Sequence, residues 1–341
     1  MANVTHYDGA KILSLKDING KKPEIYIITS NRTDGKSTFF ARMEIKRFKR
    51  DKKKFMYIVR FKDQISNVSN MIFNNVQRLF FPDDVMTHKI FEKGNYAELY
   101  LNGECCGYAV VLNAASKLKL DSSLFIDVDS IWLDEFQTMG KYCTNEVQKL
   151  IDLHYTVARG NGAAYRYVPI YLTGNHLDLF NPYYVEWHIA GRLKIDTRFM
   201  RGDGWVIHQN FNKSVIDARA DSGVTRANLN NTYIKRDTYL YDDLVIMEKP
   251  AGYSKYLCTI KYKGQSYGIY DYGYCAYFTS AFDSSFKTRF AITKDDIDNE
   301  TPHINLMPFY KDYIKRLLKA GAITFRNPEC KAACFEIFYN I

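Results

Sequence analysis

The sequence lacks any long apolar run. No apolar stretch approaches the roughly 20 residues that a helix needs to cross a bilayer, and the first residues do not follow the pattern of a signal peptide. Internal repeats and low-complexity segments are also missing. We therefore expect a soluble protein without a membrane partner.

Cysteine pairs at zinc-finger spacing are missing as well. The chain has 7 Cys, an odd number, and no C-x-x-C pair among them. Cys105 and Cys106 are adjacent, and Cys330 and Cys334 lie four positions apart. We expect buried thiols of a reducing cytoplasm at these positions rather than disulfides or metal ligands.

What the chain does have is apolar residues and positive charge. Its 341 residues are 46% hydrophobic, which is enough for two domains, or for one large and one smaller domain. The formal net charge is +9. Ten Lys or Arg lie between Phe39 and Lys62, against only Glu44 and Asp51. This cluster indicates either a polyanionic partner or a solvated surface.

The first functional motif follows an apolar strand predicted at 24–30. It is the run S-N-R-T-D-G-K-S at 30–37, and a helix is predicted from Ser37 to about residue 50. This is the strand–loop–helix setting in which G-x-x-x-x-G-K-[ST] cradles nucleotide phosphates. Ser30 replaces the first Gly, which it can do if its φ stays negative. The predicted nucleotide-binding residues are Ser30, Asn31, Arg32, Thr33, Asp34, Gly35, Lys36, Ser37 and Thr38.

Each part of this motif has an expected role. Lys36 is expected to reach the β- and γ-phosphates, and Ser37 to ligate Mg²⁺. The side chain of Asp34 is expected to point away, because a carboxylate beside a polyphosphate is unfavourable. A polar turn before a helix is the alternative interpretation.

A second motif lies about a hundred residues further on. The run at 129–136 is an apolar strand that ends in Asp134 and Glu135. Asp134 is predicted to hold Mg²⁺ and Glu135 to act as the general base that activates water. An exposed acidic turn is the alternative. The two motifs in this order favour an ATPase with ATP and Mg²⁺ as cofactors.

The remaining pattern alternates strands with helices, which predicts a mainly parallel α/β sheet with ligands at the carboxyl ends of the strands. Further elements are a helix at 145–159 and a strand at 168–175. We expect an ATPase domain at 1–200, a linker subdomain at 201–250 and a small α+β domain at 251–341.

Several segments together resemble the DNA-packaging ATPases of phi29-like bacteriophages. They are the phosphate loop, the run L-D-E-F at 133–136, the helix from Asn145 to Arg159, and the segments at 173–175 and 181–183. The resemblance is strongest over 24–184. It implies a RecA-like P-loop NTPase of the additional-strand, conserved-glutamate group that forms a pentameric ring.

The resemblance adds roles that the residues alone do not give. Arg159 matches a trans-acting arginine finger, although a surface Arg that caps its own helix is the alternative. Arg32 matches a basic residue of the loop. Asn175 matches the position that couples the γ-phosphate to movement, and Gly174 departs from the family pattern there.

For the C-terminal part the resemblance implies a vestigial nuclease domain of RNase H-like fold. An active nuclease would need converging carboxylates, and Asp271, Asp283 and the pair 295–296 do not form a convincing set. We expect a degenerate nucleic-acid-binding domain, with basic surface from Lys261, Lys263, Lys287 and Arg289.

The resemblance implies a motor that moves double-stranded DNA into a procapsid at its portal, with packaging RNA as a further partner. It would act in the host cytoplasm, transiently at the portal vertex, and be missing from the mature virion. The DNA grip is assigned to Lys62, Lys117 and Lys119. The alternatives are a terminase with an active nuclease, another ring translocase or helicase, or a nucleotide-gated scaffold without turnover.

Overall fold

The computed structural model describes residues 7–31, 33–115, 124–138, 142–159, 165–177, 181–187, 189, 193, 197–212, 222–227, 246–301, 308–319 and 322–339. Within these ranges, no helix combines the length and the apolar character that a bilayer crossing requires.

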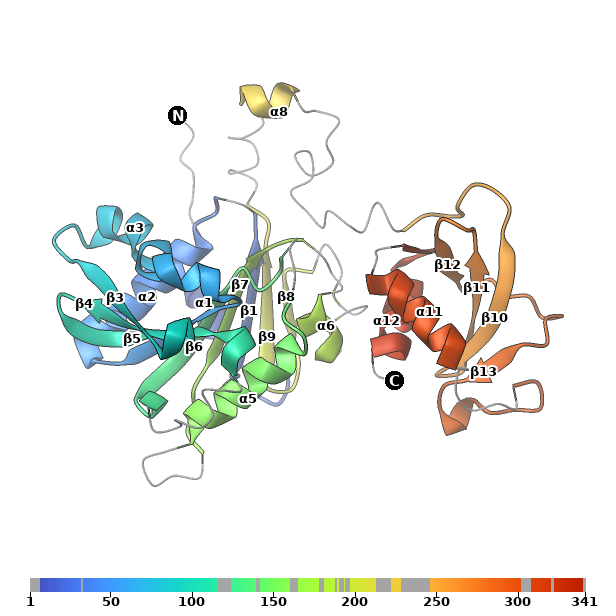
Figure 1. The fold of residues 1–341 in the computed structure, drawn as a ribbon, viewed down its shortest axis with the longest axis horizontal. Helices are drawn as coiled ribbons and strands as arrows, with labels where there is room; N and C mark the ends of the chain where they lie inside the picture. The colour runs from blue at the N-terminus through green and yellow to red at the C-terminus, as the bar shows by residue number, and fades with distance from the viewer. Residues whose placement is uncertain are drawn as a thin grey trace. The chain divides into compact units, whose positions relative to one another are not determined.

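The chain forms two compact units (Figure 1). The first comprises Met1–Leu177 and Ile195–Thr238, and the second comprises Asp178–Lys194 and Tyr239–Ile341. The α-helices described in the first unit are α1 (Ala10–Leu13), α2 (Lys36–Asp51), α3 (Val68–Phe80), α5 (Glu146–Ala158) and α8 (Gly223–Ala227). Its 3-10 turns lie at Lys62–Asn67, Glu92–Gly94 and Leu112–Ala114.

The first unit is built on a nine-stranded sheet of order β3-β4-β5-β2-β6-β7-β1-β9-β8. In the order of the sheet, each neighbouring pair from β5 to β9 is parallel. At one edge β3 and β4 join antiparallel, and at the other edge β8 pairs antiparallel with β9. The strands are β1 (Ile25–Ser30), β2 (Lys54–Val59), β3 (Met86–Phe91), β4 (Tyr96–Leu101), β5 (Glu104–Val111), β6 (Val128–Asp134), β7 (Ile170–Asn175), β8 (Phe199–Arg201) and β9 (Trp205–Asn210). The predicted α/β class is confirmed, and β7 is the additional strand between β1 and β6.

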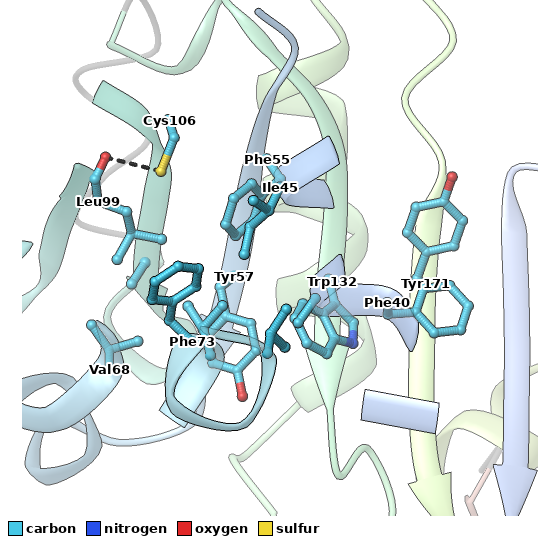
Figure 2. Packing of buried hydrophobic residues seen from close by; sticks show 14 of the residues in the cluster. Phe40, Ile45, Phe55, Tyr57, Val68, Phe73, Leu99, Cys106, Trp132 and Tyr171 are labelled. Carbon is cyan, nitrogen blue, oxygen red and sulfur yellow. Dashed lines mark hydrogen bonds between the residues drawn. The ribbon is translucent and has the colours of Figure 1, made fainter. Parts of the chain in front are cut away.

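The parallel strands are buried on both faces because helices cover them. Residues 26–30 of β1 and 55–59 of β2 are all buried. Figure 2 shows α2 placing Phe40 beside Trp132 and Tyr171, while Tyr57 packs edge-on against Trp132 at 5.0 Å between ring centroids. Each such ring contributes about 1.5–3 kcal/mol of burial free energy. This packing fixes α2, and therefore the loop before it, over the centre of the sheet.

The strand β9 differs from the sequence prediction. The sequence predicts a connecting segment at 201–250, but residues 205–210 within it pair in parallel with β1 over its full length, from Ile25 opposite Trp205 to Ser30 opposite Asn210. The run is short and is flanked by Gly, Asp and Asn, so its local pattern did not indicate a central strand. The predicted boundaries at 200 and 250 stay predictions.

The second unit has a five-stranded mixed sheet of order β13-β10-β11-β12-β14. Its elements are α6 (Pro182–Glu186), β10 (Lys255–Tyr262), β11 (Gln265–Asp271), β12 (Ala276–Thr279), β13 (Arg289–Ala291), a 3-10 turn (Lys294–Asp296), α11 (Pro308–Lys319), β14 (Ile323–Phe325) and α12 (Pro328–Tyr339). The predicted hairpin at Lys263-Gly264 is present, with φ of 49° and 76° at the turn. The α+β character of this region is confirmed.

Candidate nucleotide-binding site

The loop between β1 and α2 leads directly into the first turn of a helix, which is where phosphate-binding loops lie. Among its described residues, Thr33 and Gly35 have positive φ, 68° and 94°. Gly35 adopts this conformation without steric cost, whereas a β-branched Thr is strained there. Ser30 is not among the residues with positive φ, which is the condition under which it can replace Gly. Arg32 lies outside the described residues.

The side chain of Asp34 is bound to the end of β9 and to Asn212 just after it. Its carboxylate accepts hydrogen bonds from the side-chain amides of Asn210 and Asn212, both at 2.7 Å. The backbone N–H of Asn212 donates to the side-chain oxygen of Asn31 at 3.1 Å. Asp34 is fully buried, so these amides satisfy a carboxylate that water cannot reach. The loop is therefore held by the end of β9, which the sequence did not indicate.

Lys36 and Asn175 meet across the sheet. The Lys36 ammonium donates to the side-chain oxygen of Asn175 at 2.6 Å. Asn175 ends β7 and is the register partner of Ser30 on β1, so both residues lie at the carboxyl edge of adjacent parallel strands. The side chain of Asn175, the residue expected to couple the γ-phosphate to movement, thus contacts the phosphate-loop lysine directly.

Asp134 ends β6 at the same edge. Its carboxylate accepts a 2.5 Å hydrogen bond from the hydroxyl of Thr173, its register partner on β7. The indole N–H of Trp132 donates to the same hydroxyl at 2.8 Å. Since β7 separates β6 from β1, Asp134 lies two strand spacings, about 10 Å, from the phosphate-loop strand.

Glu135 is exposed and has a φ of 53°, a conformation that needs support from its surroundings. Arg60 provides it, because its guanidinium donates to the carbonyl oxygens of Glu135 at 2.8 Å and Phe136 at 2.6 Å. Arg60 is itself held by Glu146, with 3.0 Å from its Nε to each carboxylate oxygen. Both members of the ion pair are buried. The pair thus fixes the backbone that presents the Glu135 side chain.

Gly174 has a packing role. A Cβ at this position would lie 3.0 Å from the ring of Phe136. Phe136 is fully buried, and its N–H donates to the carbonyl of Thr173 at 3.1 Å. The absence of a side chain therefore lets the loop after β6 lie close against β7. This packing explains why Gly stands at position 174, where the sequence departs from the family pattern.

The start of α2 fits an anionic ligand. No side chain caps this 16-residue helix, and its first turn contains no acid, so its free N–H groups and partial positive charge face the loop. Ser37 and Thr38 are half-buried in that first turn. With Asp34 bound to Asn210 and Asn212 and with Lys36 alongside, this first turn presents hydrogen-bond donors that match a polyphosphate.

Arg159 follows the C-terminal end of α5, the helix that begins at Glu146. It is exposed, and it has no hydrogen-bond or ion-pair partner within the described part of the chain. Arg166 instead caps the last carbonyls of the helix. Its guanidinium donates to the carbonyl of Val157, and its backbone N–H donates to the carbonyl of Ala158. Thus a different arginine fills the helix-capping role. Because α5 has 13 residues, Arg159 lies about 20 Å from Glu146, which begins the helix.

Most of the basic cluster between Phe39 and Lys62 is neutralised. Six of its ten cations have carboxylate partners: Arg47–Glu44, Lys49–Asp84, Arg50–Asp51, Lys52–Glu104, Lys54–Asp127 and Arg60–Glu146. Lys62 is exposed, and its ammonium donates to the carbonyl of Lys93. Lys117 and Lys119 lie outside the described residues. The cluster is therefore a weaker indication of a polyanion than its charge suggested.

The acids of the second unit have structural partners. Asp271 accepts from the N–H of Gly273 and the hydroxyl of Tyr313, and Asp296 accepts from the N–H groups of the turn at 263–264. Over the described residues, no three His, Cys, Asp or Glu side chains come together as a metal site. Lys261, Lys263 and Arg289, expected as basic surface, are paired with Asp298, Glu336 and Glu300.

Comparison with known proteins places this site in a family. The DNA packaging protein of Bacillus phage phi29 is 26% identical over 346 residues, covering 97% of this chain and 96% of the relative. That of Bacillus phage B103 is 27% identical over 318 residues, covering 89% and 93%. A chain of the bacteriophage phi29 viral genome packaging motor assembly has the same fold, with a TM-score of 0.56, 24% identity and 98% of each chain covered. The sequence profile of the podovirus DNA encapsidation protein (Gp16) family matches residues 1–341, and the chain belongs to this family of phage genome-packaging proteins.

Proposed function

We propose that the chain is an ATP-hydrolysing ring motor that moves double-stranded viral DNA into a preformed procapsid. One observation carries the proposal: Lys36–Asn175 and Asp134–Thr173 lie side by side at the carboxyl edge of β1, β7 and β6. This is the edge where open α/β sheets bind ligands. Membership of the encapsidation family indicates that the free energy of ATP hydrolysis is used to package DNA.

Different groups of the chain bind the phosphates and the metal. The uncapped N-terminus of α2 and Lys36 bind the phosphates, together with the loop residues from Ser30 to Thr38. Ser37 and Asp134 hold Mg²⁺, the latter kept in place by Thr173. When bound, Mg²⁺-ATP supplies the phosphoanhydride bond whose hydrolysis releases free energy.

Glu135 takes a proton from the attacking water. A general base must be held within hydrogen-bond reach of its target, and the Arg60 contacts to the carbonyls of Glu135 and Phe136 hold this one. Asn175 shares a hydrogen bond with Lys36, so a change at the phosphates reaches β7 directly. Asn175 is therefore our candidate for coupling hydrolysis to movement.

Arg159 acts on the active site of a neighbouring subunit. It lies about 20 Å from Glu146, and Arg60 bonds both Glu146 and the backbone of Glu135. Arg159 is therefore at the far end of α5 from its own site, and its exposure makes it available to a second copy. A ring of identical subunits, five in our proposal, places each Arg159 at an adjacent site. There its charge offsets the charge that develops on the transferred phosphoryl group, an effect of about 10³–10⁵ in rate.

The partners of the ring follow from this function. They are double-stranded DNA, the portal of the procapsid and a packaging RNA, and the ring acts at the portal vertex. Lys62, with Lys117 and Lys119, grips the phosphate backbone. The segment 251–341 is a nuclease-derived domain without nuclease activity. The segment 201–250 connects it to the ATPase domain at 1–200 and also contributes β9 to the ATPase sheet.

ATP-dependent filling of purified empty capsids tests the whole proposal. We expect Glu135→Gln to abolish DNA filling and hydrolysis while fluorescent ATP analogues still bind. If Glu135→Gln hydrolyses ATP at the wild-type rate, the base assignment is wrong. If the wild-type protein turns over ATP but never fills capsids with its portal and RNA present, the motor function is wrong.

A subunit-mixing experiment tests the trans arrangement. Arg159→Ala subunits should inhibit wild-type rings more steeply than their mole fraction, because each removes a catalytic group from a functional neighbour. Arg166→Ala is the matched control, since Arg166 caps α5. Inhibition in simple proportion to dilution would show that Arg159 does not act in trans.

A further inference from the structure

The sheet of the second unit has two different faces. Helices α11 and α12 lie on one side of it (Figure 1) and bury alternate strand residues such as Ile269 and Phe278. Tyr270 and Tyr277, the next residues along the paired strands β11 and β12, therefore project from the opposite face. They gather there with Tyr272 in a separate cluster, apart from the core that the two helices cover.

This opposite face contains a hollow of about 530 Å³. We call it the tyrosine hollow. Its wall includes three tyrosines, and two cations and one acid stand at its rim: Tyr270, Tyr272, Tyr277, Lys249, Arg326 and Glu248. The volume falls within the range of sites for small organic ligands.

The rim of the tyrosine hollow is tied to the sheet. The Tyr277 hydroxyl donates to the carbonyl of Glu248, and the N–H of Met247 donates to the carbonyl of Phe325 at 2.9 Å. On the other side, the N–H of Arg326 donates to the carbonyl of Phe278 at 3.2 Å. The backbone that carries Lys249 and Arg326 is thus fixed beside the tyrosines without a ligand.

The two cations of the tyrosine hollow are available to a ligand. Lys249 and Arg326 are exposed, and neither is paired with a carboxylate of the described residues. In contrast, Lys261, Lys263 and Arg289 of the same unit each have an acidic partner. The hydroxyl of Tyr272, which is 7% exposed, is buried without a hydrogen-bond partner among the described residues.

Half-buried Tyr270 offers a flat aromatic surface beside two cations and one carboxylate. Aromatic side chains on an open sheet face stack with nucleobases, and Arg or Lys beside them bind the attached phosphate. We propose that the tyrosine hollow binds one unpaired nucleotide, with its base against Tyr270 and its phosphate at Lys249 and Arg326. A double helix cannot supply this ligand without unstacking a base.

Fluorescence anisotropy with a labelled single-stranded ten-nucleotide oligoadenylate tests the proposal. All titrations contain saturating Mg²⁺-ADP, so that the phosphate loop is occupied. We expect Tyr270→Leu and Arg326→Gln each to weaken binding about 10- to 100-fold, and Arg326→Gln to reduce the salt slope by about 0.7. Lys263→Gln is the control, because Lys263 is already paired with Glu336.

Further titrations compare RNA, DNA and a free nucleotide as the ligand. Oligoadenylate in ribose and deoxyribose forms compares the two sugars, and binding of either form supports the tyrosine hollow. Competition by free AMP shows whether one nucleotide suffices. Unchanged ATP hydrolysis and melting temperature show that the variants fold. Equal affinities of wild type, Tyr270→Leu and Arg326→Gln, or competition by duplex as strong as by single strand, would overturn the proposal.

Discussion

The side-chain amide of Asn210 donates a 2.7 Å hydrogen bond to the carboxylate of Asp34, and so joins the phosphate loop to the end of β9. Asn212 donates to the other oxygen of the same carboxylate. Because Asp34 is fully buried, loss of either donor leaves one buried carboxylate oxygen without that hydrogen bond. The conformation of the loop therefore depends on residues about 175 positions away.

A reciprocal exchange tests this dependence. Asn210→Asp should place two carboxylates together, push the loop open and weaken nucleotide binding about 10- to 100-fold. Adding Asp34→Asn should restore most of the affinity, because the amide at 34 can then donate to the new carboxylate while its oxygen still accepts from Asn212. Nucleotide titration of the two single variants and the double variant gives the coupling free energy.

Asn19→Asp provides a control for a new carboxylate placed elsewhere, since Asn19 bonds to Asp203 at the surface. It should leave nucleotide affinity unchanged. If the double variant binds nucleotide no better than Asn210→Asp alone, the hydrogen bond does not determine the loop conformation.

The Arg60–Glu146 pair should matter more for turnover than for nucleotide binding. Arg60→Met alone leaves Glu146 buried without its partner and should cost about 3–5 kcal/mol of stability. Arg60→Met with Glu146→Leu should recover part of that stability, because no charge is then buried. The double variant should still turn over about 100-fold more slowly, since nothing holds the carbonyls of Glu135 and Phe136.

Urea unfolding, nucleotide titration and steady-state hydrolysis separate these effects. Full recovery of turnover along with stability in the double variant would show that the pair acts through folding alone. A parallel loss of nucleotide affinity would place its effect on the phosphate loop instead.

The Arg60–Glu146 pair also shows what the sequence could not reveal. The phosphate-loop strand, the bend at Gly35-Lys36 and the acid pair Asp134-Glu135 were predictable because their signals are local. In each case an apolar run is followed directly by the diagnostic residues. Arg60 and Glu146 lie 86 residues apart, and nothing near either residue indicates the other. The same holds for Asp34 and its amide partners, since β9 joins the sheet only by pairing with β1.

Charge was the least reliable sequence signal. Ten cations in one stretch indicated a polyanion, but the neutralising acids Asp84, Glu104 and Asp127 lie far along the chain. Local turn chemistry was much more reliable. Asn102-Gly103 joins β4 to β5 with φ of 52° and 83°, because few other residue pairs tolerate two left-handed positions.

Stability should fall as the solution is acidified below the usual histidine range. Burial lowers the pKa of His208 to about 4, with repulsion from Lys11 adding to the effect. Between pH 6.5 and about 4 the unfolded chain binds a proton that the folded chain does not, so the free energy of unfolding decreases as pH falls. The contribution is about 1.4 kcal/mol per pH unit.

His208→Gln should remove that part of the slope. Urea unfolding at pH 6.5, 5.5 and 4.5 measures it, with His88→Gln as a control on another strand. Burial also lowers the pKa of His176, to about 3, so some pH dependence should persist in the variant. Identical slopes for wild type and His208→Gln would contradict the assignment.

The grip on DNA should depend on which lysines are already paired. Lys52 is neutralised by Glu104, whereas the exposed ammonium of Lys62 contacts a carbonyl and keeps its charge available. Each phosphate contact contributes about 0.9 to the dependence of log affinity on log salt. Lys62→Gln should therefore weaken duplex binding and reduce the salt slope by about one, while Lys52→Gln should change neither. Titrations between 50 and 200 mM salt are suitable. Equal slopes for the two variants would mean that Lys62 does not contact the DNA backbone, because both substitutions remove the same formal charge and differ only in whether that charge was free.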